Sequence, residues 1–180
     1  MIDKYYNGVI EQVYNRVGKT ERNIVMASYN NDFSIENLEM IKRYQENDDS
    51  VFFTWDEFGY RELTGAYEPF LDTICDMFRK YRDGDFDTFL TECGVYELHR
   101  EVFRSYYENG ICEREEGVLL NEVEYEQGRM TEAIAAMLKA LAKTHPIVLV
   151  INRFQMASRS AFELVYACLL YTSPSPRDRG

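Results

Sequence analysis

The chain contains 180 residues, of which 46% are hydrophobic and 28% are charged, and its formal net charge at pH 7 is −11. This length and apolar content allow one ordinary domain with a buried core. The acidic charge argues against a groove for nucleic acid, because such a surface repels the phosphate backbone. The sequence contains no run of about 18 apolar residues, the length that a membrane span needs. Met1 to Lys4 do not resemble the start of a secretory signal, so we expect a cytoplasmic protein.

The histidines and cysteines do not indicate a metal site. His99 and His145 are the two histidines, and neither has a second ligand at metal-binding spacing. We expect His99 on the surface of a helix and His145 in a loop before a strand. The cysteines form no CxxC pair, so we expect reduced thiols rather than a metal or disulfide framework. They are Cys75, Cys93, Cys112 and Cys168.

The amino-terminal part predicts a helix, a turn and a buried strand. Apolar residues recur at helical spacing over Ile2–Val17. The following Gly18-Lys19-Thr20 resembles the end of a phosphate-binding loop, but Val13 stands where the first glycine of that loop belongs, and no strand precedes it. We therefore interpret this tripeptide as a solvated turn. The short apolar run Asn23–Ser28 predicts the first strand of a sheet.

A second helix and a second strand follow. Ser34 can cap a helix that extends to Gln45 and turns an apolar face inward. The segment Val51–Trp55 is rich in β-branched and aromatic residues, which predicts a strand. The residues from Asp56 to Tyr67 are interpreted as the loop after this strand.

The middle of the chain predicts only helices. Pro69–Tyr81 has apolar residues at helical spacing, and Pro69 suits the first turn of a helix. The sequence Asp83-Gly84-Asp85 ends that helix. Two shorter helical patterns, FDTFL and VYELHREVFRSYY, lie on either side of Cys93-Gly94. The longest helical pattern is Glu115–Lys143, in which Gly128 suggests a break.

The segment after Pro146 predicts a third strand and a helix. Ile147–Ile151 is a continuous apolar run, which is typical of a strand that is buried on both faces of a parallel sheet. Ser158 can cap the helix that follows it. A buried strand, a short loop and a capped helix predict a three-layered α/β fold, in which chemistry takes place at the carboxyl ends of the strands.

This last segment resembles the Walker B region of the STAND-type signalling ATPases, which are AAA-related P-loop domains. The sequence VLVIN-RFQ-MAS-RSAFELV follows the outline of that region, in which a hydrophobic strand leads to an acidic pair and a helix. Two further segments are similar to this family: AYEPFLDTI after the second predicted strand, and EAIAAMLKALA before the third. The resemblance implies a P-loop NTPase-like parallel sheet flanked by helices, with a helical insertion.

Both nucleotide motifs of the family are degenerate in this chain. Asn152 and Arg153 stand where the family has its acidic pair. The interval Tyr29–Glu36 stands where the family has its glycine-rich loop, but it contains no glycine and has no lysine at the expected place. The resemblance implies that any nucleotide would lie against Asn30, Asn31, Ser34, Asn152 and Arg153.

The degenerate motifs leave three interpretations open. The first is a pseudo-ATPase, a signalling module of a multidomain bacterial regulator that contacts protein partners or other domains of its own chain. The second is an ATPase with atypical motifs, or a weak ATP and magnesium binder in which Arg153 contacts a phosphate. The third is an unrelated α/β domain without a ligand. We expect no catalytic residue, no resident cofactor and no contact with nucleic acid or membrane.

The carboxyl-terminal residues 168–180 are expected to lie outside the domain. Their sequence, CLLYTSPSPRDRG, resembles the translation of a sequencing adapter. On this interpretation residues 1–167 are an amino-terminal part of the P-loop domain, and a later strand of the sheet is missing. An incomplete sheet has exposed edges, so we expect poor solubility when the chain is expressed alone.

Overall fold

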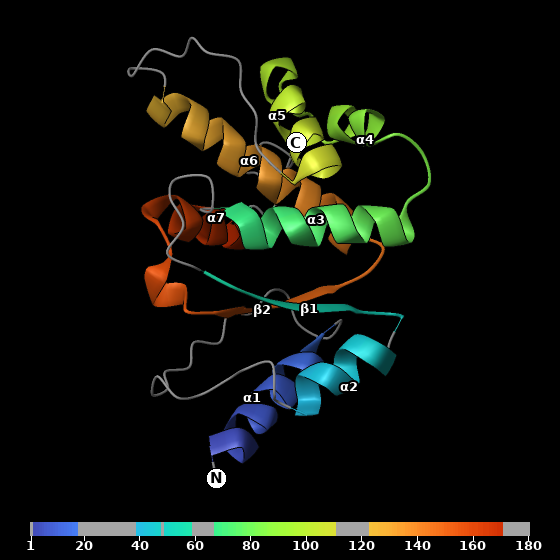
Figure 1. The fold of residues 1–180 in the computed structure, drawn as a ribbon, viewed down its shortest axis with the longest axis vertical. Helices are drawn as coiled ribbons and strands as arrows, with labels where there is room; N and C mark the ends of the chain where they lie inside the picture. The colour runs from blue at the N-terminus through green and yellow to red at the C-terminus, as the bar shows by residue number, and fades with distance from the viewer. Residues whose placement is uncertain (1, 18–38, 48, 59–66, 111–122, 171–180) are drawn as a thin grey trace, which may run out of the picture.

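The computed structural model describes residues 2–17, 39–47, 49–58, 67–110 and 123–170, and Figure 1 shows their arrangement. Most of these residues are helical, and two strands form a parallel sheet. In chain order the elements are α1 (Ile2–Arg16), α2 (Glu39–Asn47), β1 (Phe52–Glu57), α3 (Glu68–Tyr81), α4 (Phe86–Glu92), α5 (Glu97–Asn109), α6 (Val123–Ala142), β2 (Ile147–Asn152), the short 3-10 helix η4 (Phe154–Met156) and α7 (Arg159–Leu170).

The sheet lies between two helical layers, so the described residues have an α/β arrangement. Helices α1 and α2 cover one face, and α3, α6 and α7 lie on the other (Figure 1). Side chains alternate between the faces, as a strand requires. Phe53 and Val148 pack in the core under α1 and α2, while Phe52 and Leu149 pack against the core of the larger layer.

The smaller core is built mainly from aromatic and β-branched residues. The rings of Tyr14 and Tyr44 are stacked with their centroids 3.7 Å apart, and both rings lie near Phe53. Ile41 is fully buried at the centre of this layer. These contacts join α1 and α2 to the sheet.

The larger core is built mainly by the helices that come between β1 and β2 in the sequence, where a helical insertion is predicted. Phe78 contacts Phe86 and Phe89, and Phe86 is stacked on Tyr107 with ring centroids 4.2 Å apart. The guanidinium of Arg79 lies 4.6 Å from the centre of the Tyr107 ring, which covers the edge of this cluster.

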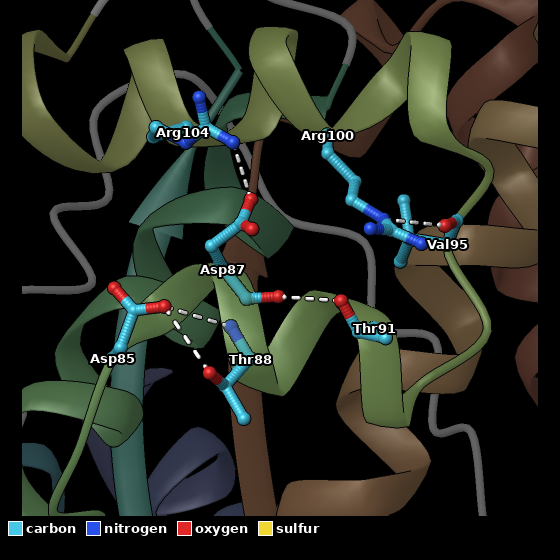
Figure 2. Close-up of polar contacts among 7 residues, drawn as sticks. All are labelled: Asp85, Asp87, Thr88, Thr91, Val95, Arg100 and Arg104. Atoms are coloured by element: carbon cyan, nitrogen blue, oxygen red, sulfur yellow. Dashed lines mark hydrogen bonds and ion pairs between the residues drawn. The ribbon is translucent and has the colours of Figure 1, made fainter.

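Short polar contacts cap α4, join it to α5 and fix the start of α5 (Figure 2). Asp85 caps α4, because its Oδ2 accepts hydrogen bonds from the backbone N–H and the hydroxyl of Thr88, at 3.0 and 3.2 Å. Arg104 on α5 forms an ion pair with Asp87 on α4. Arg100 donates from Nε to the carbonyl of Val95 at 3.0 Å. Surface ion pairs contribute little, so the buried rings rather than these contacts stabilise the helical layer.

Local sequence features account for several helix boundaries. α5 ends at Gly110, whose φ of 69° is a left-handed conformation that favours glycine. The Ser158 hydroxyl accepts a hydrogen bond from the N–H of Ala161 at 3.4 Å, so the predicted cap of α7 is confirmed. His145 lies in the connection between α6 and β2, also as predicted, and its ring is stacked on Tyr81 with centroids 3.7 Å apart.

Other predictions were wrong. His99 is buried, with 4% of its surface exposed, because it shares one face of α5 with Val102, Phe103 and Tyr106. α6 continues through Gly128 without a break. The strand predicted over Val51–Trp55 continues to Glu57.

Two sequence predictions fall on residues that the structure does not describe, and a third concerns the end of the domain. The strand at Asn23–Ser28 and the helix start at Ser34 lie outside the described residues. α7 extends to Leu170, three residues past the expected end of the domain at residue 167. In the described ranges, no helix is both long enough and apolar enough to cross a membrane.

Candidate functional site

The carboxyl ends of β1 and β2 form the candidate site. The two strands are parallel, so both ends lie at the same edge of the sheet, which is where α/β folds bind their ligands. Glu57 is paired with Asn152, and Asp56 is paired with Ile151. The register therefore brings Glu57 beside the predicted site residue Asn152, and Asp56 one position before it.

Asn152 is fixed at the end of β2 by its backbone and by its side chain. Its carbonyl oxygen accepts a hydrogen bond from the N–H of Phe58 at 3.1 Å, which continues the ladder past the end of β1. Its side-chain Oδ1 accepts a hydrogen bond from the N–H of Arg153 at 2.9 Å. Only 5% of the Asn152 surface is exposed. The side chain thus stabilises the turn after the strand, and one of its acceptor positions is already occupied.

Arg153 makes this turn in an unusual backbone conformation. Its φ of 53° and ψ of 37° are left-handed, and in the described ranges it is the one residue other than glycine with a positive φ. This conformation costs a non-glycine residue about 1–2 kcal/mol. Its carbonyl accepts a hydrogen bond from the N–H of Met156 at 2.8 Å, which closes η4. The exposed side chain of Arg153 adds a positive charge at the strand end.

Aromatic contacts hold the loop between β2 and α7 in place. The ring of Phe154 lies 5.8 Å from that of Phe58, which follows β1, and 4.6 Å from that of Phe162 on α7. Phe58 is buried in the larger core. The two strand ends are therefore joined by side-chain packing as well as by the backbone ladder.

Sequence reasoning missed Asp56 and Glu57 as candidate site residues. It ended the strand at Trp55 because the apolar run stops there, although two acidic residues directly after a buried strand are themselves a signal of a strand-end site. Asp56 is half-buried in the structure. Carboxylates at such an edge can bind Mg²⁺.

The structure describes two of the five predicted site residues. Asn30, Asn31 and Ser34 lie outside the described residues, whereas Asn152 and Arg153 are adjacent and lie at the expected strand end. The structure thus describes one half of the predicted nucleotide site. Within the described part of the chain, no group of three or more His, Cys, Asp or Glu residues is arranged to hold a metal ion.

A pocket of about 250 Å³ lies elsewhere, where α3 meets α4. Its charged lining includes Arg82, which pairs with Glu92 at 3.0 Å. The end of α3 at Tyr81 contacts Phe52, the first residue of β1, so this pocket lies toward the amino end of that strand. It is therefore separate from the candidate site.

Comparisons of the chain with models of protein families, with curated proteins and with solved structures found no match.

Proposed function

We propose that this chain is a non-hydrolysing module of the P-loop type, which acts in a cytoplasmic, multidomain bacterial signalling or transcriptional regulator. It acts through contacts with protein partners or with other domains of its own full-length chain. The observation that carries this proposal is the side chain of Asn152, which is buried and accepts a hydrogen bond from the backbone N–H of Arg153. A magnesium-dependent P-loop ATPase has a carboxylate at the corresponding position.

The arrangement of the elements supports the P-loop interpretation. β1 and β2 are parallel neighbours, and the four helices α3, α4, α5 and α6 lie between them in the chain. A capped helix follows the end of β2. The resemblance to the STAND-type ATPases implies each of these features, including the insertion before the Walker B strand.

The chemistry at the strand end supports the absence of hydrolysis. Magnesium in a phosphoryl-transfer site is held by carboxylate and phosphate oxygens, and it neutralises the charge that develops on the phosphates. Asn152 carries no charge, and its Oδ1 already accepts the Arg153 N–H. Arg153 adds a positive charge beside it, which repels a divalent cation. These two residues therefore do not fit an ATP and magnesium site of the usual kind.

One observation favours an alternative function, an active or weakly active ATPase with atypical motifs. Asp56 and Glu57 end β1 in register with Ile151 and Asn152. Two acidic residues in a neighbouring strand would supply the negative charge that Asn152 lacks. The alternative therefore places the magnesium-binding role on β1 instead of β2.

A phosphate-release assay with ATP and Mg²⁺ distinguishes the two functions. The proposal predicts release no faster than in a protein-free control, and no change in Asp56→Asn or Glu57→Gln. The alternative predicts magnesium-dependent release that falls at least tenfold in either variant. Glu101→Gln serves as the matched control, since it removes one acidic charge from an exposed position of α5, outside the candidate site. Magnesium-dependent release that Asp56→Asn abolishes would overturn the proposal.

A further inference from the structure

We propose that Asn109 and Gly110 form a site of spontaneous deamidation, at which the chain converts its own asparagine amide into a carboxylate. The site lies at the carboxyl end of α5 rather than at the candidate site, and the reaction does not depend on nucleotide binding. Its basis is the identity of the two residues, their position at the end of a helix, and the contrast with a second asparagine–glycine pair in the same chain.

An asparagine followed by glycine is the pair in which the backbone attacks the side-chain amide most readily. Glycine has no side chain to shield its nitrogen or to restrict its rotation. The sequence contains this pair at Asn7-Gly8 and again at Asn109-Gly110. The reaction joins two adjacent residues and needs only water, so no bound partner is required. The two pairs can therefore be compared within one chain.

The reaction at Asn109 is an internal substitution followed by a hydrolysis. Hydroxide takes the proton from the backbone nitrogen of Gly110, and this nitrogen attacks Cγ of Asn109. The new C–N bond forms as the bond from Cγ to Nδ2 breaks, and Nδ2 takes a proton from water and leaves as ammonia. Water then opens the cyclic imide at either carbonyl, which gives aspartate or isoaspartate. The net reaction consumes water and releases ammonia, without an oxidant or a reductant.

The structure places the attacking nitrogen at the last turn of a helix. α5 ends at Asn109, and Gly110 follows it with a φ of 69°. The N–H of Gly110 donates to the carbonyl of Tyr106 at 2.8 Å, so the nitrogen is engaged while this turn is closed. Terminal turns open more easily than helix interiors. Opening of the last turn frees the nitrogen and releases Asn109 from its helical conformation, which allows the attack.

The other pair lies in the interior of a helix. α1 extends from Ile2 to Arg16, so turns of helix lie on both sides of Asn7 and Gly8. Oδ1 of Asn7 also accepts a hydrogen bond from the N–H of Met40 on α2, at 3.3 Å. Attack on Cγ of Asn7 requires α1 to open internally and this contact between helices to break. The same chemical pair is therefore more strongly restrained in α1 than at the end of α5.

Deamidation changes both the charge and the backbone where α5 ends. The new carboxylate follows Glu108 at the carboxyl end of the helix, where the macrodipole disfavours negative charge. In isoaspartate an extra carbon enters the backbone, which disrupts the hydrogen bond from Gly110 to Tyr106. The same turn contains the carbonyl of Tyr107, which accepts a hydrogen bond from Arg79 on α3 at 2.7 Å. The modification therefore loosens the last turn of α5 and weakens its contact with α3.

Peptide mass spectrometry of the whole chain, after incubation in a mildly alkaline buffer, tests this inference. The peptides that contain Asn7 and Asn109 are followed in the same sample, and isoaspartate is detected by its specific enzymatic carboxyl methylation. In the folded chain we expect conversion of Asn109 to be at least about tenfold faster than that of Asn7, because a terminal turn opens more easily than a helix interior. In urea the two rates should become similar, because the same pair of residues then reacts without restraint.

Asn109→Gln is the matched variant, because it retains the amide and the charge while its longer side chain forms the corresponding imide far more slowly. It should abolish conversion at position 109 and leave conversion of Asn7 unchanged. Equal rates at Asn7 and Asn109 in the folded chain would overturn the inference, since position in a helix would then not control the reaction. So would an Asn109 that stays unconverted in the folded chain but reacts in urea, since the end of α5 would then not open.

Discussion

The side chain of Asn152 accepts a hydrogen bond from the backbone N–H of Arg153, at 2.9 Å, at the end of the parallel strand β2. This contact stabilises the turn that joins β2 to η4. The Oδ1 of Asn152 is therefore already engaged at the edge of the sheet where α/β proteins bind ligands. The same side chain is therefore part of the local fold and the reason that we propose a non-hydrolysing module.

Removal of the Asn152 side chain should destabilise the fold. Asn152→Ala leaves the Arg153 N–H without its acceptor, and losing a hydrogen bond near a buried site costs about 1–3 kcal/mol. Chemical denaturation should show a fall of this size in the free energy of unfolding. Gln155→Ala is the control, since Gln155 is exposed in η4, and we expect a change within about 0.5 kcal/mol. Equal stability of Asn152→Ala and the native chain would contradict the structural role given to this side chain.

The effect of a substitution at Arg153 on stability should depend on the backbone conformation that the new residue can adopt, rather than on the loss of charge. Arg153 has a positive φ of 53°, which glycine adopts without strain and which β-branched residues strongly disfavour. Arg153→Gly should have nearly native stability, because the relief of backbone strain offsets the greater freedom of glycine in the unfolded chain. Arg153→Val should lower the free energy of unfolding by about 1–2 kcal/mol. If thermal denaturation shows that Arg153→Val is as stable as Arg153→Gly, residue 153 does not maintain the left-handed conformation.

Tyr106 should make stability sensitive to alkaline pH. Its hydroxyl donates a hydrogen bond to Oδ1 of Asp72 at 2.6 Å. Burial is the main cause that raises the pKa of Tyr106 above its ordinary value, and the hydrogen bond to Asp72 adds to this effect. The native state therefore keeps this proton when the unfolded chain loses it, above about pH 10. The contribution of the Tyr106 hydroxyl to the free energy of unfolding is therefore complete below about pH 10, and it decreases as the pH rises further.

The variant Tyr106→Phe tests this pH dependence. It should lower the free energy of unfolding by about 1.5–3 kcal/mol at neutral pH, the usual value of a hydrogen bond to a charged group. Its stability should also decline less than that of the native chain above about pH 10. The matched control is Tyr107→Phe, which preserves the ring stacked on Phe86. If Tyr106→Phe declines at alkaline pH as steeply as the native chain, another group is responsible for that decline.

The thiol of Cys93 should react slowly at neutral pH. Burial raises its pKa to about 11, and the nearby Arg82 offsets this effect only in part. Alkylation requires the thiolate, so at about pH 8 the reaction should be on the order of a hundredfold slower than that of a free cysteine. Iodoacetamide labelling followed by peptide mass spectrometry measures this rate at Cys93 alone. The denatured chain is the control, and equally fast labelling of folded and denatured chains would contradict the prediction.

The sequence was most informative where one physical signal dominated. The apolar run at Ile147–Ile151 identified the strand β2, and Ser158 identified the start of the helix that follows it. It was less informative where two signals competed. The polar residues after Trp55 suggested a loop, although backbone pairing with β2 extends the strand to Glu57. His99 is polar, but its spacing from Val102 and Tyr106 places it on the buried face of α5.

The candidate site shows a similar limit. Asn152 and Arg153 were predicted from the resemblance of one local segment to a Walker B region. The pairing of Asn152 with Glu57 depends on the register between two strands whose paired residues are about 95 positions apart in the chain, and periodicity within one segment does not reveal such a register. The signal that was available, an acidic pair directly after an apolar run, was interpreted as the start of a loop.

An NMR titration of the ¹⁵N-labelled chain with ATP and Mg²⁺ tests the central claim most directly. It follows the backbone amides of Asp56, Glu57, Phe58, Asn152 and Arg153. The proposed function predicts no saturable, magnesium-dependent shift at these residues, because the carboxyl end of β2 has a bonded amide and a cation in place of two carboxylates. Saturable shifts that require Mg²⁺ and disappear in Asp56→Asn would contradict it, since they would show a metal-dependent nucleotide site at the ends of both strands.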